Sequence, residues 1–168
     1  MIEPAHALLM AHYNRWMNEK LYAACARLTD DQRRRDQGAF FGSVHATLNH
    51  ILYGDLAFMS RFTGDPPHPP ALGEEIHAAF EALHAARTEM DERLVAFAGG
   101  LDADWLARPL SYVSNVDKRE HTLSRCVLVT HLFNHQTHHR GQITTLLSQA
   151  GIDVGSTDLP FMPGVEAF

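Results

Sequence analysis

The stretch "HLFNHQTHHRGQ", residues 131–142, concentrates histidine in one short segment, at His131, His135, His138 and His139. On an α-helix, at about 100° per residue, these four side chains fall within an arc of about 100°. Leu128 and Leu146 fall within the same arc, so the histidines share the buried face of a helix. A buried imidazole is costly unless its ring nitrogens find partners. One such histidine could be a satisfied core residue, but four neighbours favour a bound metal ion.

Metal binding accounts for the crowding because histidines at positions i and i+4 direct two imidazoles to one point, about 2 Å from each nitrogen. The stretch holds two such pairs, His131/His135 and His135/His139, together with an i, i+3 pair, His135/His138. Spacing alone does not decide which pair is used.

A third ligand must come from another helix, and the stretch "SVHATLNHILYGD" offers His45 and His50. These two histidines are about 140° apart on a helix, so at most one can point at a shared centre. Leucine and isoleucine flank His50, which favours a position nearer the core, whereas His45 shares a face with Asn49.

Working outward, apolar residues recur at helical spacing in four long segments, near residues 4–28, 42–62, 74–98 and 122–150. The stretch "TGDPPHPPALG", residues 63–73, separates the second segment from the third, because its prolines and glycines cannot remain helical. Four helices with one long crossover predict an all-α fold, a four-helix bundle formed by a single domain over residues 1–168.

The remaining segments are predicted to be short or irregular. A weakly alternating stretch with turn residues in its middle predicts a small hairpin or extended loop near residues 110–120. The tail, residues 151–168, is too rich in glycine and proline for a helix and too apolar to stay free, so we expect it to pack on the body. The fourth helix is expected to begin at Thr122 or Ser124.

Composition excludes several classes of protein. The 168 residues include 14 basic and 20 acidic side chains, a formal net charge of −6, whereas a general nucleic-acid binder needs a basic face. No stretch approaches the roughly 20 apolar residues of a membrane span, and the N-terminal stretch lacks the basic residues of a secretory signal. Cys25 and Cys126 are interpreted as buried free thiols, which favours the reducing cytoplasm.

The sequence resembles the DinB/YfiT-like family over nearly the whole chain. The similarity is carried by "YNRWMNEKLY" (13–22), "FFGSVHATLNHILYGD" (40–55) and "HLFNHQTHHRGQITTLL" (131–147). This resemblance implies an up-down-down-up bundle that holds a divalent metal, often zinc or nickel, through one histidine of the second helix and two of the fourth. Matched residue by residue, the metal ligands are His50, His135 and His139. His131 then borders the metal cavity or packs nearby, and His138 is the alternative ligand if the helix is rotated.

Several other polar and small residues have predicted roles. Arg140 points about 180° away from the cluster and is interpreted as a surface or interface ion-pair residue. Gly141 is expected to let a neighbouring helix approach closely. Three residues of the second helix are candidates to line the cavity: Asn49, Tyr53 and Asp55.

Three histidines leave open coordination positions on a metal ion, as catalytic sites do. The spare ligand Cys126 would lie about 13 Å from His135 along the helix axis, out of reach. An open position can lower the pKa of a water or a thiol. The resemblance implies a metal-dependent hydrolase or a thiol S-transferase, using a low-molecular-weight thiol on a small electrophile in stress response or detoxification. No catalytic residue is identified from the sequence.

Two alternatives remain. The chain could be a non-catalytic bundle whose metal ion is structural or sensory. It could also act as a dimerisation module, with Trp16, Trp105 and Phe161 forming the interface of a homodimer.

Overall fold

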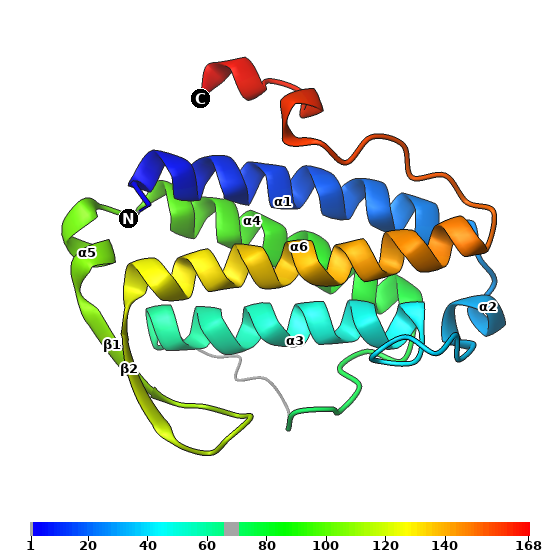
Figure 1. The fold of residues 1–168 in the computed structure, drawn as a ribbon, viewed down its shortest axis with the longest axis horizontal. Helices are drawn as coiled ribbons and strands as arrows, with labels where there is room; N and C mark the ends of the chain where they lie inside the picture. The colour runs from blue at the N-terminus through cyan, green and yellow to red at the C-terminus, as the bar shows by residue number, and fades with distance from the viewer. Residues whose placement is uncertain (1, 66–70) are drawn as a thin grey trace.

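The computed structural model describes residues 2–65 and 71–168, so the middle of the predicted crossover, residues 66–70, lies outside the described residues. The chain is mostly helical, and its four long helices are α1 (Pro4–Cys25), α3 (Val44–Thr63), α4 (Phe80–Gly99) and α6 (Arg125–Gln149). They lie side by side, with α1 and α6 running in one direction and α3 and α4 in the other (Figure 1). Both α1 and α3 pack against α4 and α6.

The expected all-α character holds for most of the chain, and a small two-stranded sheet precedes α6. Strand β1 (Pro109–Val113) pairs antiparallel with β2 (Glu120–Ser124), so the hairpin expected near 110–120 is present and longer than predicted. The other short elements are α2 (Asp30–Arg34), α5 (Ala103–Ala107), and two 3₁₀ turns, η1 (Leu159–Phe161) and η2 (Val165–Ala167).

Local capping sets the ends of the two helices that carry the histidines. The Ser43 hydroxyl accepts a hydrogen bond from the N–H of Ala46 (3.1 Å) at the start of α3, and Gly64 ends that helix with a φ of 77°. Ser124 caps α6 in the same way. Of the two expected starts of the fourth helix, Ser124 is therefore confirmed as the N-cap, whereas Thr122 lies in the hairpin.

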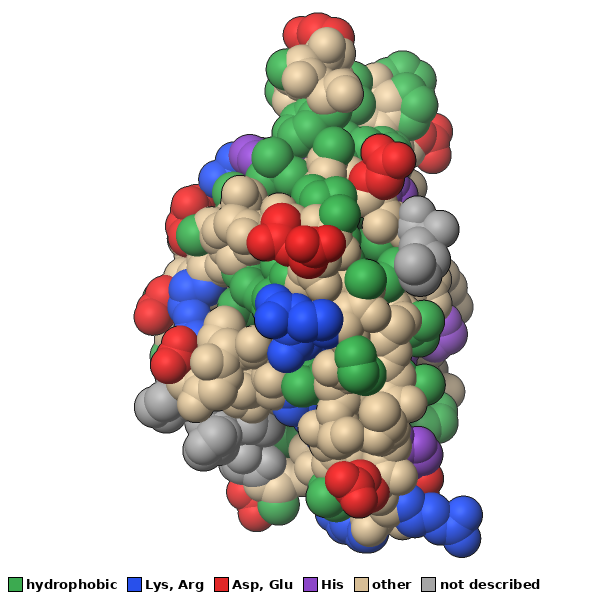
Figure 2. All heavy atoms as spheres, turned by 90° about the vertical axis from the view of Figure 1, so that its left-hand side faces the viewer, with side chains coloured by type: hydrophobic (Ala, Val, Ile, Leu, Met, Phe, Trp, Pro, Cys, Tyr) green, Lys and Arg blue, Asp and Glu red, His purple; other side chains and the backbone are tan. Residues whose placement is uncertain are grey.

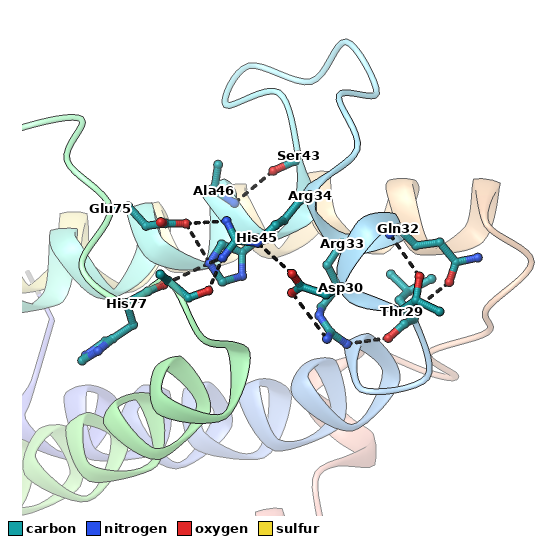
Figure 3. A network of polar contacts seen from close by, with 12 residues as sticks. Thr29, Asp30, Gln32, Arg33, Arg34, Ser43, His45, Ala46, Glu75 and His77 are labelled. Carbon is teal, nitrogen blue, oxygen red and sulfur yellow. Dashed lines mark hydrogen bonds and ion pairs between the residues drawn. The ribbon is translucent and has the colours of Figure 1, made fainter.

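The end of the crossover is anchored on α3 by the contacts around His45 (Figure 3). His45 is buried, and its Nε2 lies 2.9 Å from Oε1 of Glu75 and 3.0 Å from the carbonyl oxygen of His77. Arg34 of α2 forms an ion pair with the same Glu75 at 2.8 Å. The Asn49 side-chain oxygen accepts a hydrogen bond from the His77 N–H at 2.9 Å. These contacts hold the segment in a non-helical conformation, so α4 begins six residues later than the expected residue 74.

A buried polar network links the four long helices. Arg87 of α4 pairs with Asp55 of α3, and its other terminal nitrogen lies 3.0 Å from an oxygen of Asp91. Gln136 of α6 donates to the same Asp55 carboxylate. Two α1 amides donate to the Asp91 carboxylate, Asn18 at 2.9 Å and Asn14 at 3.2 Å.

Arg140 belongs to this interior, so the expectation that it lies at the surface is wrong. It is 3% exposed, and it donates to Oδ1 of Asn14 and, at 3.3 Å, to Oε1 of Gln136. Helix α6 packs on α1 as well as on α3, so the face opposite the histidines is also buried.

The tail runs back along α1 (Figure 1). The Tyr13 hydroxyl donates to the Thr157 carbonyl oxygen at 2.6 Å, and Met162 is buried. The end of the molecule that carries α5 shows acidic and basic side chains interspersed with apolar ones (Figure 2). Within residues 2–65 and 71–168, every helix is too short or too polar to cross a bilayer.

Candidate metal centre

Three histidines from two helices converge at one point. One ring nitrogen each of His50, His135 and His139 lies within 4.8 Å of the others. Nε2 of His50 is 3.0 Å from Nε2 of His135, and the rings of His135 and His139 have centroids 4.4 Å apart. The structure thus brings together the three residues that the sequence predicts as ligands, and their binding of a metal stays a prediction.

The two other histidines of α6 do not join this group. His131 lies one turn before His135 and packs on Phe58, with ring centroids 5.0 Å apart. His138 is exposed, and its Nε2 lies 3.3 Å from the side-chain nitrogen of Gln142. Of the pairs that spacing left open, only His135/His139 faces His50.

Gly54 makes room for the central histidine of the group. A Cβ atom at Gly54 would lie 2.8 Å from Cε1 of His135, a distance that real Cβ atoms essentially never show. Gly141, which we expected to permit a close approach, has nothing within 4 Å of such an atom, so that expectation is wrong. The sequence contains one indication of this role, because Gly54 lies one turn after His50 on the same face of its helix.

Gln142 sets the orientation of His139. An amide oxygen can only accept, so Nδ1–H of His139 donates to Oε1 of Gln142, 2.8 Å away. This bond leaves the lone pair of Nε2 free for a metal ion. Gln142 shares the arc of the histidines in sequence, but its hydrogen-bonding role emerges only from the structure.

The electrostatics of the group favour neutral imidazoles. Burial, reinforced by the neighbouring His139, lowers the pKa of His50 to about 4. Burial and the adjacent histidines lower the pKa of His135 to about 3, and burial also lowers the pKa of His139. All three rings are therefore neutral near pH 7, which is the form that binds metal ions.

Phe41 covers the group from the loop that precedes α3. Its ring stacks on His50, with centroids 3.9 Å apart, and lies 5.4 Å from the ring of His139. The loop turns sharply at Gly42, whose φ of 76° favours glycine. Sequence reasoning did not assign this role to Phe41.

The three histidines form part of the wall of a pocket of about 600 Å³. Most of the other lining side chains are aromatic or apolar, including Phe40, Phe41, Tyr53, Phe58, Tyr112 and Val116. The turn of the hairpin reaches this pocket, where Asn115 donates to the Tyr53 hydroxyl at 2.6 Å. Among the three residues expected to line the cavity, only Tyr53 does so, because Asn49 binds the crossover and Asp55 pairs with Arg87.

Comparison with known proteins places this fold and site in a family. The chain matches the profile of the DinB family over residues 1–166. It belongs to the DinB family. Protein DinB of Bacillus subtilis (strain 168) is 27% identical to it over 158 residues, which cover 90% of each chain.

The histidine group of this DinB-family chain offers three candidate ligands among the described residues. Within them, no cysteine or carboxylate joins the histidine group. Cys25 is a buried free thiol of the core, and Cys126 lies in another hollow, beside Ile2 and His6. Family membership and the histidine group together indicate a metal-binding protein, because three neutral imidazoles suit a divalent transition metal.

Proposed function

We propose that this DinB-family protein is a metal-dependent enzyme, a thiol S-transferase or a hydrolase, that acts on a small electrophile. His50, His135 and His139 would hold one zinc or nickel ion. The observation that carries the proposal is the position of the three ligand nitrogens in the wall of a pocket of about 600 Å³, without a fourth ligand among the described residues. A small molecule can therefore reach the ion.

The donor set fits such an ion. Its three nitrogens lie close enough to share one centre, their pKa values are lowered, and Gln142 leaves Nε2 of His139 free. A divalent ion bound there supplies Lewis acidity and lowers the pKa of a water or thiol.

The protein's own groups would bind and orient the reactants. Phe41 covers the histidines and limits access of bulk water from the loop side, while Phe58 and Tyr112 offer apolar surface to a substrate. The Tyr53 hydroxyl, held by Asn115, is the polar group of the wall best placed to orient a reactant, since it lies one turn from His50.

The alternative is a structural or sensory metal bundle. Structural zinc normally has four protein ligands. The three-ligand group favours the enzyme, and a low-molecular-weight thiol is the co-substrate that we propose for the transferase reaction.

The remaining parts of the proposal concern fold and setting. The helix directions support an up-down-down-up four-helix bundle. The buried free thiols support a reducing compartment, the cytoplasm.

We also propose a homodimer: Phe161 is 65% exposed and available for an interface. Trp105 contributes less than expected, because its ring packs on Phe62 and Phe97. A nucleic-acid partner is not proposed, given the net charge of −6.

The test begins with protein purified without a nickel resin. Metal analysis should give one divalent ion per chain, retained in His138→Ala and lost in His139→Ala. Cobalt-substituted protein is then titrated with glutathione and with cysteine. A sulfur-to-cobalt charge-transfer band at millimolar thiol, followed by turnover of a small electrophile, supports the transferase. A spectrum unmoved by any thiol sinks the transferase, and absence of hydrolysis as well leaves the structural bundle.

A further inference from the structure

Arg61 is a charged side chain of the pocket for which the metal centre provides no role. It follows His50 by 11 residues on α3, which amounts to about three turns and about 16 Å along the axis, on the same face. It lines the same pocket as the histidine group. The pocket therefore has an imidazole end and a guanidinium end.

The guanidinium of Arg61 is held in place by aromatic rings. Its central carbon lies 4.6 Å from the ring centroid of Tyr112 and 5.0 Å from that of Phe58. One terminal nitrogen donates to the Val113 carbonyl oxygen at 3.3 Å. Stacking on two rings fixes the plane of the guanidinium, so the group is preorganised to bind an anion.

Arg61 is also a cation without an acidic partner among the described residues. No carboxylate in residues 2–65 and 71–168 forms an ion pair with it. Its side chain is half-buried, and burial lowers its pKa from the usual value, although a guanidinium stays charged at neutral pH. A guanidinium carries five N–H donors, so Arg61 retains donors for a ligand. By contrast, the ion pairs of Arg34 and Arg87 use carboxylates of this chain.

The surroundings of Arg61 carry positive charge in an acidic protein. In the part of the chain that the structure describes, the residues that line the pocket include no aspartate or glutamate. An adjoining hollow of about 630 Å³ shares Arg61 and adds Lys118 at its edge, again without an acidic side chain. A cleft of one sign concentrates small ligands of the opposite sign, here anions.

We infer that Arg61 is the anchor for a carboxylate, and that the pocket takes a small anionic molecule of defined length. The carboxylate pairs with the guanidinium, an apolar or aromatic body lies against Phe58 and Tyr112, and the opposite end reaches the histidine group. One guanidinium in the pocket matches one carboxylate, in the bidentate geometry that arginine favours. The identity of the reactive end rests on the proposed function, whereas the carboxylate subsite does not.

Matched probes that differ only in charge test this inference. Zinc-loaded protein is titrated calorimetrically with 8-mercaptooctanoate and 8-mercaptooctanol, and with the three-carbon pair 3-mercaptopropionate and 3-mercaptopropanol. We expect the eight-carbon acid to bind about tenfold more tightly than its alcohol, as one charge-assisted contact provides. The three-carbon pair should show little preference, because it cannot span the two ends.

Variants assign the preference to one residue. In Arg61→Gln the acid and the alcohol of eight carbons should bind equally, with the affinity for the alcohol unchanged. Arg61→Lys should restore part of the preference for the acid. The melting temperatures of both variants, compared with that of the wild type, show whether they are folded. Arg108→Gln, which removes an exposed arginine outside the pocket, should leave the preference intact. A preference that is missing in the wild type, or that survives in Arg61→Gln, overturns the inference.

Failure of the proposed function gives a different result. Zinc-free protein is titrated with octanoate and octanol, which carry no thiol. A preference for octanoate that is lost in Arg61→Gln supports the carboxylate subsite even if no thiol ever binds the metal. If thiols perturb the cobalt spectrum but acids and alcohols bind alike, the proposed function stands and the carboxylate subsite is refuted.

Discussion

Two polar regions of the protein lie back to back on the same two helices. Asp55 and Gln136 belong to the buried network, and the residues that directly precede them, Gly54 and His135, belong to the histidine group. In the network, Asp55 is matched by the opposite charge of Arg87. In the histidine group, three neutral imidazoles face one another and a pocket.

This difference separates a structural polar cluster from a binding site. Charges buried in a protein must be paired, and a paired network mainly holds its helices in register. Imidazoles that face one another satisfy each other only in part. Across the 3.0 Å between them, one of the Nε2 atoms of His50 and His135 can donate to the other, and the lone pair of Nε2 of His139 is still left. Their arrangement becomes favourable when a cation takes the lone pairs. We therefore expect damage to the network to affect folding, and damage to the histidine group to affect metal binding.

The largest effect should come from removing a ligand. His135→Ala should abolish stoichiometric zinc binding, because it leaves two imidazoles, while the metal-free protein should unfold at nearly the wild-type urea concentration. Zinc content after dialysis and urea titration measure the two effects. The control is His131→Ala, which should weaken binding by about 10- to 100-fold at most. Equal losses in the two variants would show that the wrong pair has been assigned.

The network should show the opposite pattern. Arg87→Met leaves Asp55 and Asp91 buried without their cation, which should reduce the free energy of unfolding by about 3–5 kcal/mol. Urea denaturation of the metal-free protein measures this loss. Arg27→Met, at an exposed position, should change stability by less than about 0.5 kcal/mol. A fully stable Arg87→Met protein would mean that the network does not hold the helices together.

A pair of glycines provides a smaller and more local test. Gly54→Ala places a methyl group against His135 and should weaken zinc binding about tenfold or more, as when the support of a ligand is lost. Gly141→Ala meets open space, so it should leave zinc affinity unchanged and stabilise the helix by up to about 1 kcal/mol. Zinc competition with a chromophoric chelator compares them. Identical affinities would contradict the close approach of His135 to α3.

A loss of stability is also expected at acidic pH. The pKa values of His50 and His135 are lowered from 6.5 to about 4 and about 3, so the unfolded chain takes up protons first as the pH falls. Their contribution to stability is present above pH 6.5 and is lost as the pH approaches 4 and 3. Urea denaturation of the metal-free protein at pH 7 and at pH 4.5 should show this loss of unfolding free energy. The double variant His50→Gln/His135→Gln should lose less stability than the wild type between the two pH values. Equal losses of stability in the wild type and the double variant would show that the pKa values of His50 and His135 are not lowered.

The sequence predicted the features that depend on local periodicity. Four helical segments, the hairpin and the shared face of the α6 histidines all follow from residue spacing. The choice of His50 over His45 came from the family resemblance. The residue pattern around His50 also predicts that it lies nearer the core than His45, and this prediction is wrong. His45 is 1% exposed and buried under the crossover, whereas His50 is only partly buried and faces the pocket.

The features that were missed depend on which element lies opposite. Periodicity puts Arg140 opposite the histidines, which predicts a surface or interface ion-pair residue, but α6 is covered by α1 on that side. The role expected for Gly141 belongs to Gly54, because only the latter meets a histidine across the helix interface. Helical periodicity gives the angle of a side chain and not its neighbour across an interface, so it places Gly54 on the face of His50 but does not show that His135 lies opposite.

We propose that three histidines hold a metal ion which keeps one coordination position open to the pocket. X-ray absorption at the zinc edge of the zinc-loaded protein tests it most directly, before and after addition of a small thiol. We predict nitrogen or oxygen neighbours alone at about 2.0–2.1 Å without thiol, with an imidazole pattern lost in His139→Ala, and one sulfur at about 2.3 Å after addition. A sulfur neighbour before any thiol is added, or a spectrum that the thiol leaves unchanged, would contradict the open three-histidine site.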